Sequence, residues 1–199
     1  MDEPRKRLPF DNVQVSRLPP LPEPIDPIAL GLFEDSLARG GPILNLHLVQ
    51  AHAPKLARAR RPYATALRNE CAAPRLLREV AIVRACQIVG CDYELAQHGP
   101  MVLAAGLSPA QYDALADWRS RSDLFEPRER ALLAYLDCLG LAKGEVDDAT
   151  FAGMEKHFSA QEILELTLCF TNYYGSGLMM RALRIAIDAP EQKGVAEKS

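Results

Sequence analysis

Four residues in the middle of the chain, Glu79, Cys91, Glu94 and His98, have side chains that could carry acid–base or thiol chemistry. On a helix that turns 100° per residue, Cys91, Glu94 and His98 fall within about 60° of one another on one face. Glu94 and His98 are four residues apart, so their side chains can meet directly. Glu79 precedes Cys91 by twelve residues, and a tight turn at Gly90 can fold it back over the same face.

A thiol, two carboxylates and an imidazole between two helices are costly to bury without partners or shifted pKa values. Such groups gather where acid–base chemistry is done, so the spacing indicates a catalytic site. A structural interpretation stays open beside it. Glu94 and His98 can form an ordinary surface pair, and Cys91 can be a buried residue at the start of a helix.

The helices that position these residues can be located from their end signals. The helix with Glu79 is expected to begin at Pro74 and to end at Gly90, and the next to run from Cys91 to about Ala105. Gly175 and Gly177 are expected to kink the last helix or to allow close packing. Capping boxes, prolines and apolar periods predict the other helices at about 27–39, 43–51, 54–69, 109–118, 126–142, 148–157 and 160–187.

The sequence shows no convincing strand and no repeat of fixed period, so the predicted fold class is all-α. Seven of the fifteen prolines lie in residues 1–27, which we therefore expect to form an extended N-terminal arm. Two interpretations of the arm stay open, a disordered leader or a segment laid across its own body or a neighbouring subunit. The helical domain is expected over 28–189, followed by a loose polar tail over 190–199.

Composition narrows the function classes. The 199 residues are 48% hydrophobic and carry a net charge of −3, which argues against a nucleic-acid partner. No run approaches the ~18 apolar residues of a membrane span, and the opening residues lack the apolar core of a secretory signal, so we expect a cytoplasmic protein with no membrane partner. Neither a disulfide framework nor a zinc site nor another cofactor is expected, because the five cysteines are scattered without a Cys-x-x-Cys pair: Cys71, Cys86, Cys91, Cys138 and Cys169.

The run from Arg78 to Ser108, REVAIVRACQIVGCDYELAQHGPMVLAAGLS, resembles the signature of the carboxymuconolactone decarboxylase and alkyl hydroperoxidase D (AhpD) superfamily. That signature has a Glu on one helix, a glycine-terminated turn, Cys-x-Tyr-Glu or Cys-x-x-Cys, and then a His four residues on. Flanking segments extend the resemblance to about residues 30–187. It implies an AhpD-like helical bundle with a two-helix active-site motif, in a homotrimer or homohexamer that acts on a small-molecule substrate.

One departure from the hydroperoxidase pattern favours one of the activities that the resemblance implies. Two thiols cycle through a disulfide in those members, but Glu94 stands where the second cysteine would be, three residues after Cys91. The retained Glu–His pair resembles the decarboxylase instead. We therefore expect cofactor-independent decarboxylation, or related proton transfer, on a small acidic lactone or aromatic-derived substrate.

In this hypothesis His98 is the acid or base, Glu94 orients its tautomer and stabilises imidazolium, and Glu79 is a second acid or base. Cys91 would line the pocket or act as a weak donor. The candidate substrate-binding residues are His52, Arg84 and Tyr93, although for Arg84 the role of a solvated helix residue is preferred. Trp118, Tyr173 and Tyr174 are interpreted as packing residues that could wall the pocket.

Two other functions stay open. One is a one-cysteine thiol peroxidase, in which Cys91 reduces peroxide with a relay from Glu79 through His98 and an external thiol restores it. The other is a non-catalytic oligomeric binding protein.

Overall fold

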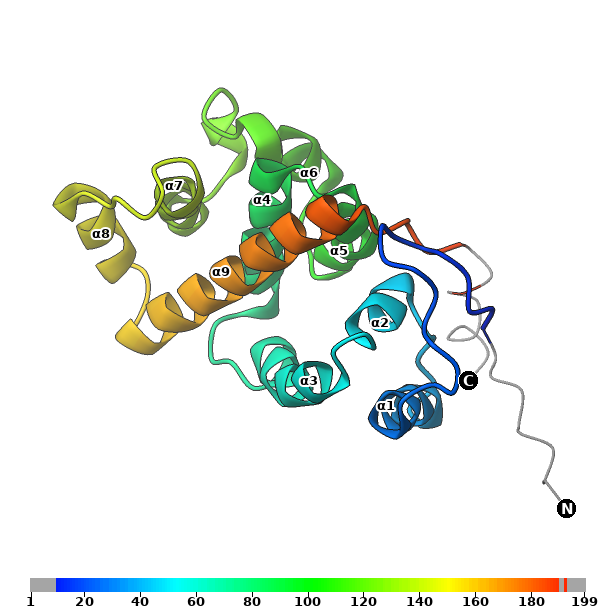
Figure 1. The fold of residues 1–199 in the computed structure, drawn as a ribbon. Coiled ribbons are helices and arrows are strands. Elements are labelled where there is room, and N and C mark those ends of the chain that lie inside the picture. The colour runs from blue at the N-terminus through cyan, green and yellow to red at the C-terminus, as the bar shows by residue number, and fades with distance from the viewer. Residues whose placement is uncertain (1–9, 190–191, 193–199) are drawn as a thin grey trace, which may run out of the picture. The chain divides into compact units, whose positions relative to one another are not determined.

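The computed structural model describes residues 10–189 and 192, and all regular structure in this part of the chain is helical. This confirms the all-α prediction. The helices of Figure 1 are α1 Pro27–Ala38, α2 Asn45–Gln50, α3 Pro54–Asn69, α4 Arg75–Val89, α5 Asp92–Ala104, α6 Pro109–Ala114, α7 Pro127–Gly140, α8 Asp148–Glu155 and α9 Ala160–Leu183. Two 3-10 turns, η1 (Leu115–Asp117) and η2 (Ser122–Leu124), lie between α6 and α7.

The chain forms two compact groups of residues, divided between 62 and 63 and again between 182 and 183. The first group holds α1, α2 and the start of α3, together with the segments before and after them, and the second holds the rest. This grouping differs from the single helical domain expected over 28–189. The reason is that α1 and α2 share a separate apolar cluster with the arm: Leu21, Ile25, Ala29, Phe33, Ile43, Leu48 and Ala51.

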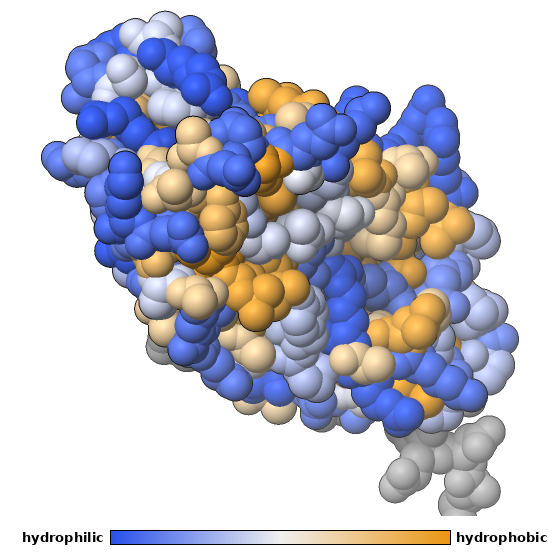
Figure 2. Space-filling view, turned by 90° about the vertical axis from the view of Figure 1, so that its left-hand side faces the viewer, coloured by the Kyte–Doolittle hydropathy of each residue, from blue (hydrophilic) through white to orange (hydrophobic). Residues whose placement is uncertain are grey.

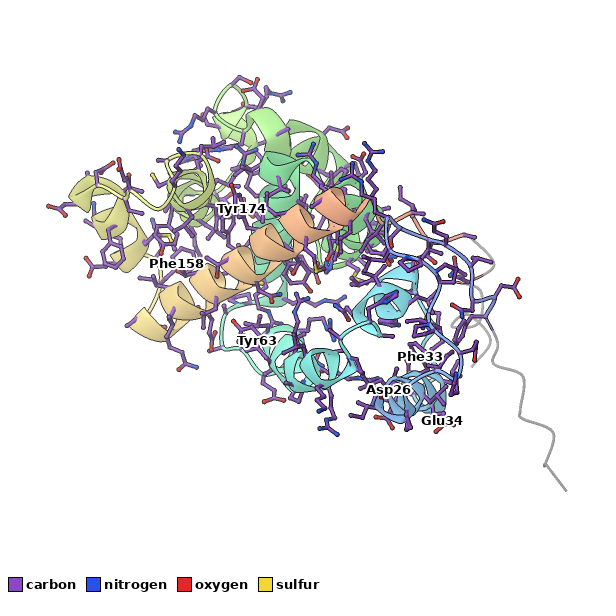
Figure 3. All side chains as sticks on the ribbon, viewed as in Figure 1. Asp26, Phe33, Glu34, Tyr63, Phe158 and Tyr174 are labelled. Carbon is purple, nitrogen blue, oxygen red and sulfur yellow. The ribbon has the colours of Figure 1, made fainter. Side chains whose placement is uncertain are left out.

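The described part of the arm, residues 10–26, contains no helix and packs within the first group. The ring of Phe10 meets Phe33 of α1 edge-on with centroids 5.1 Å apart, and Phe33 is labelled in Figure 3. Backbone hydrogen bonds join Arg17 N to Leu183 O at 2.7 Å and Ala186 N to Val15 O at 2.8 Å. The rest of the predicted arm, 1–9, and of the predicted tail, 190–191 and 193–199, lie outside the described residues.

The second group is built around α4, which packs against α5 and α7. Because its sequence is apolar on nearly every side, α4 buries most of its length, with Ala81, Val83 and Cys86 wholly inaccessible. Glycine allows α7 to approach it closely, since a Cβ at Gly140 would lie 2.9 Å from Ile88 Cδ1. A helix buried on all sides holds its polar side chains in fixed surroundings, which matters for Glu79.

Most helix ends follow the sequence signals. Asp26 caps α1 by accepting from Ile28 N, and Gly90 ends α4 in the left-handed conformation at φ 74°. The end of α9 differs from the expected 187: the helix stops at Leu183, and Arg184 takes φ 52°. The chain beyond it pairs its backbone with the arm instead of continuing the helix. Within the described residues no helix is both long and apolar enough to span a membrane.

Candidate active site

Glu79 and His98 are brought together by the reversal between α4 and α5. Nδ1 of His98 donates to Oε2 of Glu79 at 2.8 Å, and the two side chains are only 7% and 9% exposed. Gly90 makes this possible because its positive φ lets the chain turn back within one residue. The predicted meeting of these two residues is therefore observed.

Glu94 lies on the other side of the same imidazole. Its Oε2 is 3.6 Å from Nε2 of His98, one helical turn away on α5, and both side chains are 7% exposed. This separation is longer than a hydrogen bond but close enough for a strong charge interaction in a buried setting. The ring of His98 thus lies between two carboxylates.

The arrangement assigns different tasks to the two ring nitrogens. An ionised Glu79 accepts a proton-bearing Nδ1, which fixes the tautomer and the plane of the ring. Nε2 is then the nitrogen that faces Glu94 and is left to exchange a proton with a substrate. The cluster can act as a general acid or base.

Cys91 is the N-cap of α5 and is 1% exposed. Its Sγ lies 3.9 Å from Sδ of Met180, and in the described chain no hydrogen bond or ion pair joins it to His98. Burial raises the pKa of this thiol, and the Glu94 carboxylate raises it further, while backbone N–H groups at the start of α5 act in the opposite direction. Cys91 is therefore a neutral thiol beside the cluster.

Tyr173 of α9 forms another wall of the cluster. Its ring meets the His98 ring edge-on, with centroids 4.8 Å apart and an interplanar angle of 80°. Burial raises the pKa of its phenol, and the negative charge of Glu94 adds to the effect. The positive charge of Arg68, in the last turn of α3, acts on the pKa of this phenol in the opposite direction. Arg68 has no signal in the sequence, because nothing there shows that α3 ends beside α9.

Arg84 does not join the cluster, and it is not the solvated helix residue considered above. It is buried, and its guanidinium donates from two nitrogens to Oδ1 of Asp137, at 2.8 and 2.7 Å. A further nitrogen donates to the carbonyl oxygen of Ala116 at 3.1 Å. The other carboxylate oxygen of Asp137 accepts from Nε1 of Trp118 at 3.1 Å. Arg84 and Trp118 therefore hold η1 against α4 and α7.

The other candidates have separate positions. Tyr93 is buried in the first turn of α5, next to Glu94. His52 belongs to the first group of residues, where it is exposed and its Nε2 lies 3.1 Å from the carbonyl oxygen of Pro19. Tyr174 (labelled in Figure 3) stacks on Phe170 with centroids 5.6 Å apart, in a packing role.

Two further observations concern metal ligands and a groove on the surface. Across the described residues, no three His, Cys, Asp or Glu side chains are placed to hold a metal ion. A groove of about 510 Å³, with Tyr135, Phe151, Phe158 and Leu164 in its walls, contains none of the candidate site residues. Figure 2 faces the side of α7 and α8, where apolar residues alternate with hydrophilic ones.

Comparison with known proteins identifies the region that holds the cluster. Residues 54–137 match the sequence model of the carboxymuconolactone decarboxylase family, and this segment contains Glu79, Glu94 and His98. Residues 54–137 are thus similar to members of that family. The family resemblance stated from the sequence is thereby confirmed.

Solved structures extend the likeness to nearly the whole chain. A peroxidase-related protein from Silicibacter sp. TM1040 covers 95% of this chain and 96% of its own, with a TM-score of 0.74 and 20% identity. The alkylhydroperoxidase AhpD core protein from Ralstonia eutropha JMP134 covers 90% of this chain and 95% of its own, with a TM-score of 0.73 and 24% identity. These likenesses confirm the AhpD-like helical fold.

A curated sequence relative is the uncharacterized protein YnjA of Escherichia coli (strain K12). It is 32% identical over 92 residues, which are 46% of this chain and 50% of YnjA. The chain thus spans about half the length of the curated relative that it matches.

Proposed function

We propose that this chain is a cofactor-independent enzyme that transfers a proton to or from a small acidic substrate. Decarboxylation of a lactone or aromatic-derived acid is the reaction that the site supports best. The observation that carries the proposal is the buried imidazole of His98, fixed by Glu79 at 2.8 Å on one nitrogen and facing Glu94 at 3.6 Å on the other.

The proposed reaction needs one proton and no external electrons. The bond between the substrate carbon and its carboxylate breaks, CO₂ leaves, and the electron pair moves into the conjugated carbonyl of the substrate. Nε2 of His98 then delivers a proton to the carbon, and the ring returns to the neutral form. Glu79 keeps the ring in place, while Glu94 stabilises the imidazolium before the transfer.

Carboxymuconolactone, the compound named in the family description, is the first substrate to test. Turnover in D₂O should release CO₂ and place one deuterium on the product carbon. An isomerisation would add deuterium without CO₂, so the same assay separates the two reactions. Other small lactone and aromatic acids complete the panel.

The variant His98→Gln should lower kcat by about 10²–10⁴-fold, the usual contribution of a positioned acid or base. His157→Gln is the matched control, since His157 is exposed and outside the cluster. Undiminished turnover in His98→Gln would contradict the proposed mechanism.

A second candidate, thiol peroxidase activity, is favoured by the peroxidase-related description of the solved relatives. In that reaction the Cys91 thiolate attacks the peroxide oxygen, the O–O bond breaks, an alcohol leaves, and an external dithiol reduces the resulting sulfenate. The burial and raised pKa of Cys91 argue against it. If Cys91→Ser abolished peroxide consumption, this function would replace the first.

A further inference from the structure

The outward face of α9 differs from the charged surface of an ordinary amphipathic helix. Its inward face packs in the second group through buried residues such as Phe170, Tyr173 and Met180. The stretch 166–180 contains no charged residue, so the outward face is uncharged there as well. In Figure 1, α9 lies in front of α4, with no other helix of the second group in front of it. A helix without charge on either face is typical of one that is covered on both sides.

The exposed residues of this face form a regular row, the α9 seam: Leu164, Leu168, Thr171, Gly175, Leu178 and Ala182. They follow one another at alternating steps of four and three residues, which is the spacing of the contact positions in a coiled coil. Leu164 and Leu178 are 59% and 51% exposed, although leucine is among the residues most often buried. A second helix lying along the seam would bury these leucines.

The α9 seam is complementary to itself when a second copy lies along it in the opposite direction. With Thr171 of both copies at a common two-fold axis, Leu164 of one copy lies opposite Leu178 of the other. The same register places Leu168 opposite Gly175, where a Cβ would meet nothing within 4 Å among the described residues. A large side chain of each copy thus faces the smallest residue of the other, and an alanine at 175 would keep this fit.

The groove of about 510 Å³ extends the seam beside the N-terminal half of α9. Leu164 belongs to both the seam and the groove, which is also lined by Phe151 and by Thr167 of α9. On a helix that turns 100° per residue, Leu178 projects to the same side of α9 as Thr167. In the antiparallel pair, Leu178 of each copy therefore reaches the groove of the other, and both grooves are covered at once.

Charge favours the same direction of packing. The exposed carboxylate of Glu155 lines the groove, and the exposed Arg181 lies near the other end of α9. One nitrogen of the Arg181 guanidinium donates to the carbonyl oxygen of Val89, which leaves further N–H donors. Antiparallel packing places Arg181 beside Glu155 of the second copy, and the symmetry forms this pair twice. Parallel packing would bring like charges together instead.

We propose that a second copy of this chain packs antiparallel along the α9 seam, about a two-fold axis at Thr171. This inference is independent of the proposed catalytic function. The resemblance noted from the sequence implies a homotrimer or a homohexamer. A trimer cannot pair all of its α9 helices in this way, whereas a hexamer can, as three such pairs.

The mass of the assembly in solution tests the pairing. The chain has a mass of 22.0 kDa, so light scattering of the full protein should give an even multiple of this value. Leu168→Lys places a charge in the middle of the seam and should halve the mass of the assembly. Leu103→Lys is the matched control, because Leu103 of α5 is 38% exposed against 36% for Leu168 and lies outside the seam; it should keep an even number of copies. A monomeric or trimeric native chain, or an unchanged mass in a helical Leu168→Lys, would overturn the inference.

Cysteine cross-linking tests the direction of the two helices, in a chain whose partly exposed Cys71 and Cys138 are replaced by serine. Under mild oxidation Thr171→Cys should join two copies through a disulfide, because position 171 of both copies lies at the axis. Leu164→Cys should not, since its two copies would be about 21 Å apart along the pair. Cross-linking of both variants would indicate parallel helices, and cross-linking of neither would exclude the contact; either result contradicts the proposal.

Discussion

Glu79 and His98 share a hydrogen bond of 2.8 Å although they lie 19 positions apart in the sequence. The bond crosses from the middle of α4 to the middle of α5, so it depends on the packing of both helices. It therefore couples the shape of the helix pair to the orientation of the imidazole.

Removing the Glu79 carboxylate should affect both stability and activity. In Glu79→Ala the Nδ1 of a buried imidazole loses its acceptor, which should lower the free energy of unfolding by about 1–3 kcal/mol. Glu79→Gln retains an acceptor oxygen and should recover part of that stability. Urea unfolding of the two variants checks this. Equal stability of Glu79→Ala and the native chain would show that the bond contributes nothing.

The ion pair of Arg84 and Asp137 should be a structural element. Asp137→Leu leaves Arg84 as an unpaired buried cation, so the free energy of unfolding should fall by about 3–5 kcal/mol. The double variant Arg84→Met with Asp137→Leu should be more stable than Asp137→Leu alone, as urea unfolding will measure. Arg119→Ala is the control, because this 62% exposed partner of Asp137 should contribute little. A double variant less stable than the single one would contradict this account.

The thiols should divide into two classes by reactivity. Cys86, Cys91 and Cys169 are buried, and Cys71 and Cys138 are partly exposed. Burial raises the pKa of the first three, to about 12 for Cys169, so they hold little thiolate near neutral pH. A thiol reagent such as DTNB should label Cys71 and Cys138 first and the others only on unfolding. Fast labelling of Cys91 would instead support the peroxidase alternative.

Stability should also fall at alkaline pH. The pKa of Cys169 rises on folding from an ordinary 9.0 to about 12, so the native chain retains a proton that the unfolded chain has lost. The stabilisation is complete below pH 9 and decreases as the pH rises from about 9 toward 12. Urea unfolding across this range should show a smaller decrease for Cys169→Ala than for the native chain. Identical pH dependence would exclude the contribution of Cys169.

Two glycines of α9 should respond in opposite ways to substitution. Gly175 has open space, so Gly175→Ala should raise the free energy of unfolding by about 0.5–1 kcal/mol. A Cβ at Gly177 would lie 3.2 Å from Cβ of Cys91 and 3.3 Å from Cγ1 of Val89, so Gly177→Val should lower it by about 1–3 kcal/mol. Thermal unfolding of both variants tests the contrast, which would fail if Gly177→Val were as stable as the native chain.

Local signals predicted the helices because each acts within a few residues. Gly90 and Cys91 mark one turn, and the Glu94–His98 spacing follows from helix geometry alone. The edge-on contact of Tyr173 with His98 could not be assigned in this way, since helices far apart in the sequence bring the two rings together. The position of Arg84 likewise depends on α7, because Asp137 of that helix forms the buried ion pair with it.

The hydrogen bonds between residues 15–17 and 183–186 have a consequence for biosynthesis. The ribosome makes residues 15–17 long before their backbone partners at 183–186. The bonds between the arm and this segment therefore cannot form until the chain has been synthesised past residue 186.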